Sequence, residues 1–265
     1  MATIKRTQAE LDAIFERLER EYMRLNERQQ RYAVREIGRI RSEIAEFLAE
    51  YADDKGVITR RRLSRVLRDL DEIERSLREQ GEIVMNRIIE ETSEWTTKAV
   101  TNAAGISLSN AQFDRVNEHV VRYVVKRFGD DGLVLSERIW GLSGEIRDEL
   151  STVIRSGIIR GDGINSMIPR IRQVYDNETW KIRRLARNES VTAHRAAISY
   201  NAQSSDIVRW VKFHHGEKRS DACVSLANED RYGMGRGIFK PTDTDIWMPH
   251  VNCTGYITYV IEDGD

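Results

Sequence analysis

The stretch Ile207-Val208-Arg209-Trp210-Val211-Lys212-Phe213-His214 decides the fold class, because the hydrophobic pattern changes its period there. Upstream of it, apolar residues recur every three or four positions, as on one face of an amphipathic helix. Within it, the period is two and apolar groups fall on both faces, as in a strand. A second β-rich run follows at 255–260. The sequence therefore predicts a predominantly helical α+β protein, with C-terminal helices packed on a small antiparallel sheet.

The clearest helix is predicted over residues 7–51, where apolar residues form a heptad-like stripe with charged residues around it. The stripe changes phase near 29–33, which resembles a stutter in a coiled coil. A turn at 52–56 separates it from a second helix that reaches about residue 104, with Gly81 as a weak point. Two alternatives remain open: an antiparallel hairpin within the chain, or a coiled coil with another chain.

The rest of the chain divides at changes in pattern and at turn residues. Ser109 and Gln112 form a predicted capping box, and the β-branched run at 120–125 makes a strand the competing prediction for that region. We expect three segments: a helical leader at 1–104, a helical middle region at 105–176 and an α+β domain at 177–265. Without the leader, the C-terminal domain is expected to stay soluble. The remaining helices are expected at 109–128, at 136–157 with Ser136 as the cap, at 168–175 and at 178–201, followed by a glycine-containing loop over 220–240.

Composition narrows the classes of function. The formal net charge is −1, so the chain as a whole has no strong electrostatic attraction to nucleic acid. Two cysteines are too few for a disulfide scaffold and suit thiols in a reducing compartment or metal ligands. No apolar run approaches the length of a membrane span, and the N-terminus lacks the apolar core of a signal peptide. We therefore expect no membrane partner, and synthesis in the cytoplasm of the producing cell.

Histidine and cysteine concentrate in the last quarter of the chain. His250 and Cys253 stand three residues apart, as in half of a zinc site, and Cys223 is a candidate third ligand. His214 or the neighbouring His215 is a candidate fourth. Two alternatives remain open for the same residues: buried thiols and hydrogen-bonded imidazoles with a structural role, or a cysteine nucleophile with a histidine base.

Basic residues suggest a second kind of site. The last long helix has a positive side, and a glycine cluster follows it at 233–237. These side chains could contact phosphate of double-stranded DNA, whereas the default interpretation is a solvated face. The candidate arginines are Arg183, Arg184, Arg187 and Arg195 on the helix, and Arg231 and Arg236 near the glycines.

Four short stretches of the C-terminal part carry a resemblance to a known family. The stretches are Ala186-Arg187-Asn188-Glu189 with Ala196-Ala197, Val208-Arg209-Trp210-Val211, Arg219-Ser220-Asp221-Ala222-Cys223 with Leu226 and Pro241, and Met248-Pro249-His250-Val251-Asn252-Cys253-Thr254-Gly255. In this order they resemble the phage Mu F-like minor head protein (phage head morphogenesis) family. The resemblance covers roughly residues 150–262. The family's closing Cys-Arg-Cys corresponds here to Cys253-Thr254-Gly255, so one candidate ligand of the family pattern is missing.

The resemblance implies a minor capsid protein of a tailed phage, located in the virion at the portal vertex. It implies the portal protein and capsid or scaffolding protein as partners, with roles in procapsid assembly and in DNA packaging or ejection. It implies no established enzyme. Two alternatives remain: a DNA-binding module that escorts the genome, and a hydrolase or nuclease that depends on the Cys and His residues.

Overall fold

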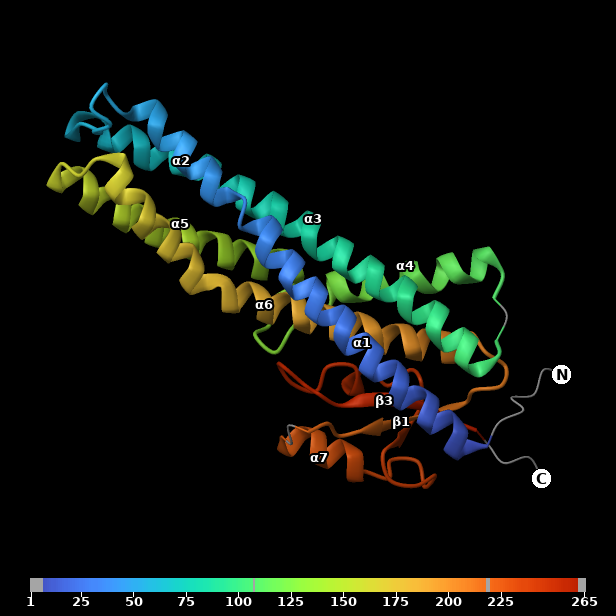
Figure 1. The fold of residues 1–265 in the computed structure, drawn as a ribbon. Coiled ribbons are helices and arrows are strands. Elements are labelled where there is room, and N and C mark those ends of the chain that lie inside the picture. The colour runs from blue at the N-terminus through green and yellow to red at the C-terminus, as the bar shows by residue number, and fades with distance from the viewer. Residues whose placement is uncertain (1–6, 107, 218–219, 262–265) are drawn as a thin grey trace. The chain divides into compact units, whose positions relative to one another are not determined.

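The computed structural model describes residues 7–106, 108–217 and 220–261, which form seven α-helices, two short 3-10 helices and three strands (Figure 1). The α+β prediction, predominantly helical with a small antiparallel sheet, is confirmed. No helix in these described ranges has the length and apolar character that a membrane span requires. The elements are α1 (Gln8–Ile37), α2 (Ile40–Tyr51), a 3-10 helix (Arg60–Arg62), α3 (Leu63–Ala104), α4 (Asn110–Lys126), α5 (Leu135–Arg160), α6 (Ile164–Gln203), β1 (Trp210–His214), α7 (Asp221–Asn228), β2 (Ile238–Phe239), a second 3-10 helix (Thr244–Ile246) and β3 (Tyr256–Val260).

The sheet has the order β2-β1-β3, and both neighbouring pairs are antiparallel. Val211 of β1 is in register with Phe239 of β2 and with Tyr259 of β3. These three side chains are buried, as is Phe213. The strand predicted over 207–214 is present as β1 at Trp210–His214, and it is the central strand of the sheet.

The chain packs as two compact units, each built from segments that are distant in sequence. Unit 1 contains the described residues of 1–29, 86–132 and 186–265, and unit 2 contains 30–85 and 133–185. Helices α1, α3 and α6 each contribute residues to both units. The contiguous segments 1–104, 105–176 and 177–265 do not coincide with these units, because packing groups residues by contact and not by order along the chain.

In unit 1, the beginning of α1 packs on α6 and β3. The Tyr22 and Ser190 hydroxyl groups lie 3.1 Å apart, and the rings of Phe15 and Tyr259 have centroids 4.8 Å apart. The Tyr259 hydroxyl donates to the Ile198 carbonyl at 3.0 Å. The stripe residues Leu11, Phe15, Tyr22 and Leu25 are buried within the chain. These contacts favour packing inside one chain over an intermolecular coiled coil for this stripe.

In unit 2, α2 contacts α3, which follows the turn at 52–56. The Tyr51 hydroxyl donates to the Asp69 carboxylate at 2.5 Å, and Ser76 donates to Glu43 at 3.2 Å. Helix α3 runs unbroken through Gly81, and a Cβ there would lie 2.8 Å from the Ile139 side chain of α5. Gly81 is thus a point of close helix approach and not a break.

The predicted single helix over 7–51 is wrong, because it divides into α1 and α2 at Gly38-Arg39. Glycine has low helix propensity, and at this position it also allows a close contact. A Cβ on Gly38 would lie 3.2 Å from the Tyr175 ring, whose hydroxyl donates to the Val34 carbonyl at 2.9 Å. The break therefore lies several residues beyond the phase change at 29–33.

The separate helices predicted at 168–175 and 178–201 are one helix, α6, which contains Pro169. Proline removes one backbone donor, and near a helix start that loss is tolerated.

The cap predicted at Ser136 is also wrong. Helix α5 has Val134 as its N-cap residue, and the Val134 amide donates to the Glu137 carboxylate at 2.9 Å.

The region 220–240 is not a simple loop, because it contains α7 and β2. The competing strand at 120–125 is also absent, since these residues belong to α4 with its predicted capping box at Ser109 and Gln112. Val116, Val120 and Val124 are four residues apart and bury one face of that helix. Tertiary packing of this face outweighs the β-propensity of the valines.

Candidate metal centre

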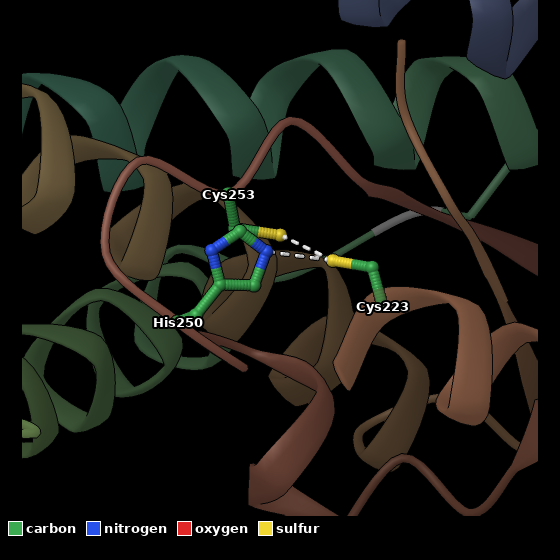
Figure 2. A group of neighbouring side chains, drawn as sticks. All are labelled: Cys223, His250 and Cys253. Atoms are coloured by element: carbon green, nitrogen blue, oxygen red, sulfur yellow. Dashed lines mark hydrogen bonds between the residues drawn. The ribbon is translucent and has the colours of Figure 1, made fainter. Parts of the chain in front are cut away.

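Cys223, His250 and Cys253 come together in unit 1 (Figure 2). The Cys223 Sγ lies 2.9 Å from His250 Nε2 and 3.3 Å from Cys253 Sγ. The ligand atoms of all three residues lie within 4.8 Å of one another. Both cysteines are free and buried, and His250 is half-buried. The structure therefore brings together the three residues that the His-x-x-Cys spacing and the upstream cysteine singled out.

Helix α7 positions Cys223. Ser220 is its N-cap residue, and the Ser220 hydroxyl accepts from the Cys223 amide at 3.2 Å. This cap satisfies a backbone donor that the helix leaves free and fixes the first turn. Cys223 lies in that turn, so the cap also fixes the position of its side chain. Arg219, the first residue of the matching stretch quoted above, lies outside the described residues.

The loop that carries His250 and Cys253 is held by two side chains of α6. The Asn188 Oδ1 accepts from the Asn252 amide at 3.0 Å, where Asn252 has a positive φ of 59°. Arg195 donates to the carbonyls of Trp247 at 3.0 Å, Cys253 at 3.4 Å and Gly255 at 2.5 Å. Arg195 is only 1% exposed. The loop conformation therefore depends on α6.

The hydrogen bonds around the donor atoms suit a metal. His250 Nδ1 lies 2.9 Å from the Val251 carbonyl, and a proton on Nδ1 leaves the Nε2 lone pair facing Cys223. The Gly255 amide donates to Cys253 Sγ at 3.4 Å, so this sulfur already accepts one backbone hydrogen bond. Two sulfurs and one imidazole nitrogen form a donor set that zinc prefers. The residues present therefore fit the zinc that the sequence suggested.

Burial raises the pKa of Cys223 to about 11 in the metal-free chain. At neutral pH this thiol keeps its proton and is a weak nucleophile. A cation that binds here must displace the proton. The raised pKa argues against the alternative of a cysteine nucleophile with a histidine base.

The fourth ligand predicted at His214 is not part of this group. Its Nε2 lies 3.0 Å from the Thr258 hydroxyl, and its ring stacks on Tyr256 with centroids 4.6 Å apart. Burial, with a further contribution from Lys212, lowers the pKa of His214 from 6.5 to about 4. A strand alternates its side chains between two faces, and His214 lies on the same face as its cross-strand partner Tyr256. The neighbouring His215 contacts the Gly216 carbonyl through Nδ1 at 3.3 Å and is also outside the group.

The six candidate arginines do not share one environment. Arg195 is excluded from phosphate contact, because it is buried and bound to carbonyls. Arg231 is bound to Glu229 at 2.8 Å and to Asp245 at 2.7 Å, so its charge is largely neutralised. Arg183 and Arg184 in unit 2 and Arg236 in unit 1 are exposed, whereas Arg187 is half-buried, and Arg184 lies 4.8 Å from the centre of the Trp180 ring.

The roles of Asn188 and Arg195 in the site were not predicted from the sequence. A signal was present, because seven residues are nearly two helical turns and place both side chains on one face of α6. Arg195 was assigned to a positive surface, since arginine is rarely fully buried. Only the fold shows that its guanidinium meets three backbone carbonyls.

Comparisons of the chain with protein-family models, with curated proteins and with solved structures found no match. The case for a function therefore depends on the residues of the site and on how the fold places them. The strongest feature is that α6, α7 and the 247–255 loop meet at Cys223, His250 and Cys253.

Proposed function

We propose that this chain is a minor head protein of a tailed phage, located in the virion at the portal vertex. Its partners would be the portal protein and capsid or scaffolding protein, and it would assist procapsid assembly and DNA packaging or ejection. Its C-terminal part would carry a zinc ion on Cys223, His250 and Cys253. The protein would act by binding partners and not as an enzyme.

One observation carries this proposal: three of the stretches that resemble the head morphogenesis family meet at one place. Asn188 belongs to the first stretch, Cys223 to the third, and Asn252 and Cys253 to the fourth. Asn188 accepts from Asn252 at 3.0 Å, and Cys223 lies 3.3 Å from Cys253. A chance likeness among separated short stretches would not require their side chains to converge. The convergence supports a shared site and therefore supports the resemblance to the head morphogenesis family.

Zinc bound at this site would supply a structural link between α7 and the 247–255 loop. The chain's own residues prepare that link. Ser220 fixes the turn that carries Cys223, and Arg195 holds the carbonyl of Cys253. Residues that orient metal ligands in this way commonly decide the affinity of a site.

Partner binding has support from exposed aromatic side chains. Trp140 on α5 and Trp180 on α6, both in unit 2, are 57% and 52% exposed. Aromatic residues are enriched in protein interfaces and often dominate their binding energy. The heptad-like stripe of α1 is itself buried, so we assign partner contact to such exposed residues and not to that stripe.

The alternative of a DNA-escort module has less support. Of the six arginines that suggested it, Arg195 is buried and Arg231 is paired with carboxylates. Phosphate contact requires several cations that are free to meet the backbone of DNA. The net charge of −1 adds no long-range attraction.

Mass spectrometry of purified heads tests the proposal directly. Heads of the phage that encodes the chain are separated from tails and from soluble protein, and the chain is expected in the head fraction together with the portal protein. The Trp140→Ala and Trp180→Ala double variant is expected to lose incorporation and to keep its melting temperature. Met234→Ala, a 44% exposed apolar residue of unit 1, is the matched control. Recovery of the unaltered chain only in the soluble fraction would refute the proposal.

A further inference from the structure

The candidate metal centre has three donors where zinc usually takes four. Structural zinc sites are almost always closed by four protein ligands, whereas sites with three protein ligands keep one position for another molecule. Among the described residues, the group that can hold an ion consists of Cys223, His250 and Cys253. His214 is bound to Thr258 and stacked on Tyr256, so the histidine predicted to complete the site is directed elsewhere.

Gly255 cannot be the place of a fourth side chain. A Cβ at this position would lie 2.8 Å from the His214 carbonyl oxygen and 2.6 Å from Cζ of Phe213. The His214 carbonyl belongs to β1, in the centre of the sheet, and cannot move aside without disturbing the pairing with β3. Gly255 also accepts from Arg195 through its carbonyl at 2.5 Å. The close packing at Gly255 therefore leaves no room for a side chain that could bind the metal.

The His250 side of the cluster is more exposed than the side formed by the two cysteines. Cys223 and Cys253 are buried, whereas His250 is half-buried and its neighbour Val251 is 42% exposed. An outside ligand can therefore approach along the His250 side of the group. Two thiolates and one neutral imidazole would balance the two positive charges of a zinc ion, so an uncharged ligand suits the fourth position well.

We propose that a metal ion bound by Cys223, His250 and Cys253 keeps one exchangeable coordination position, which holds water and accepts a monodentate imidazole or thiol donor from outside the chain. This inference rests on the zinc site in the proposed function and adds how that site is completed. A balanced charge around the ion weakens its power to acidify a bound water.

The test uses the full chain with cobalt(II) in place of zinc, because the visible spectrum of cobalt reports the number and kind of its ligands. We expect a sulfur-to-cobalt charge-transfer band that saturates at one equivalent of metal. Addition of imidazole is expected to shift the visible bands to a new saturating spectrum. Cys223→Ser is expected to lose much of the charge-transfer intensity, whereas His214→Gln is expected to match the unaltered chain in both spectra.

The outcomes separate this inference from the proposed function. If imidazole leaves the cobalt spectrum unchanged, the chain supplies four ligands and the inference is refuted, although the zinc site stands. If His214→Gln alters the starting spectrum, His214 is the missing ligand and the inference also fails. If no metal binds, both the inference and the zinc site fail. The presence of the chain in phage heads is measured independently of all three results.

Discussion

Arg195 is the residue on which the candidate metal centre depends most. Its guanidinium donates to three backbone carbonyls of the 247–255 loop, and the side chain is almost wholly buried. A buried charge is tolerated only when hydrogen bonds compensate for its lost hydration. The loop and the arginine therefore stabilise each other, and the ligands His250 and Cys253 depend on this arrangement.

Replacement of Arg195 by Met is expected to lower the free energy of unfolding by roughly 3 kcal/mol or more, because three carbonyls lose a charged donor. Urea denaturation measures the change. Arg236→Met removes an exposed arginine and is expected to change stability by less than about 0.5 kcal/mol. Equal effects of the two substitutions would show that Arg195 is not a structural anchor.

His214 makes stability depend on pH. Its pKa is lowered from 6.5 to about 4, mainly by burial. Between these values the unfolded chain binds a proton that the folded chain does not, so the free energy of unfolding falls as pH falls from 6.5 towards 4. His214→Gln is expected to flatten this part of the stability curve, measured by urea denaturation at several pH values. His119→Gln, at an exposed histidine of α4, should leave the slope as it is; a flattening there of similar size would contradict the assignment.

At the scale of elements, α7 is a short helix that carries Cys223 in its first turn. It has eight residues, too few to be stable alone, so its cap and its packing decide whether it forms. Ser220 at its N-terminus and Ser109 at the N-terminus of α4 accept amide hydrogen bonds in the same way. The two serines thus offer a matched comparison between a helix that carries a ligand and one that does not.

Ser220→Ala and Ser109→Ala are each expected to lower the free energy of unfolding of the metal-free chain by about 1 kcal/mol, because each removes an N-cap. Only Ser220→Ala is expected to weaken metal binding, by about tenfold, since it loosens the turn that orients Cys223. Competition with a zinc chelator measures the affinity. Unchanged affinity in Ser220→Ala would mean that α7 is held by other contacts.

At the scale of the whole molecule, the two units are built from interleaved segments. Unit 1 needs the first part of α1, the last part of α3 and the C-terminal segments together. The buried polar side chains of this unit show that α1, α3 and α6 depend on one another. The hydroxyl groups of Thr92 in α3 and Tyr22 in α1 each lie 3.1 Å from the Ser190 hydroxyl of α6. His194 of α6 likewise stacks on Tyr22 with centroids 3.8 Å apart.

Residues 105–265 alone are therefore expected not to fold cooperatively, which reverses the expectation from sequence that the C-terminal domain is soluble without the leader. Removal of 1–104 exposes the faces of α6 and β3 that α1 and α3 cover in unit 1. Thermal unfolding followed by circular dichroism is expected to show a broad, uncooperative change for this fragment and a sharp one for the full chain. A sharp transition in the fragment would show that the C-terminal part is an independent domain.

The sequence alone determined the local features of this protein. Hydrophobic periods located most of the helical regions and the strand near 210–214, although not every helix boundary. Ser109 and Gln112 identified a capping box that the structure confirms. The spacing of His250 and Cys253, with Cys223 upstream, indicated the three members of the candidate site. Such features depend on residues close in sequence or on side-chain chemistry, and both can be read from the order of amino acids.

Only the tertiary structure decided which distant residues meet. In the folded chain His214 contacts Thr258, and the buried Arg195 donates to three backbone carbonyls. Unit 1 contains segments from both ends of the chain. Local periodicity is the same whether a stripe packs inside the chain or on another chain. Burial and pairing depend on contacts between residues far apart in sequence, and these exist only once the chain has folded.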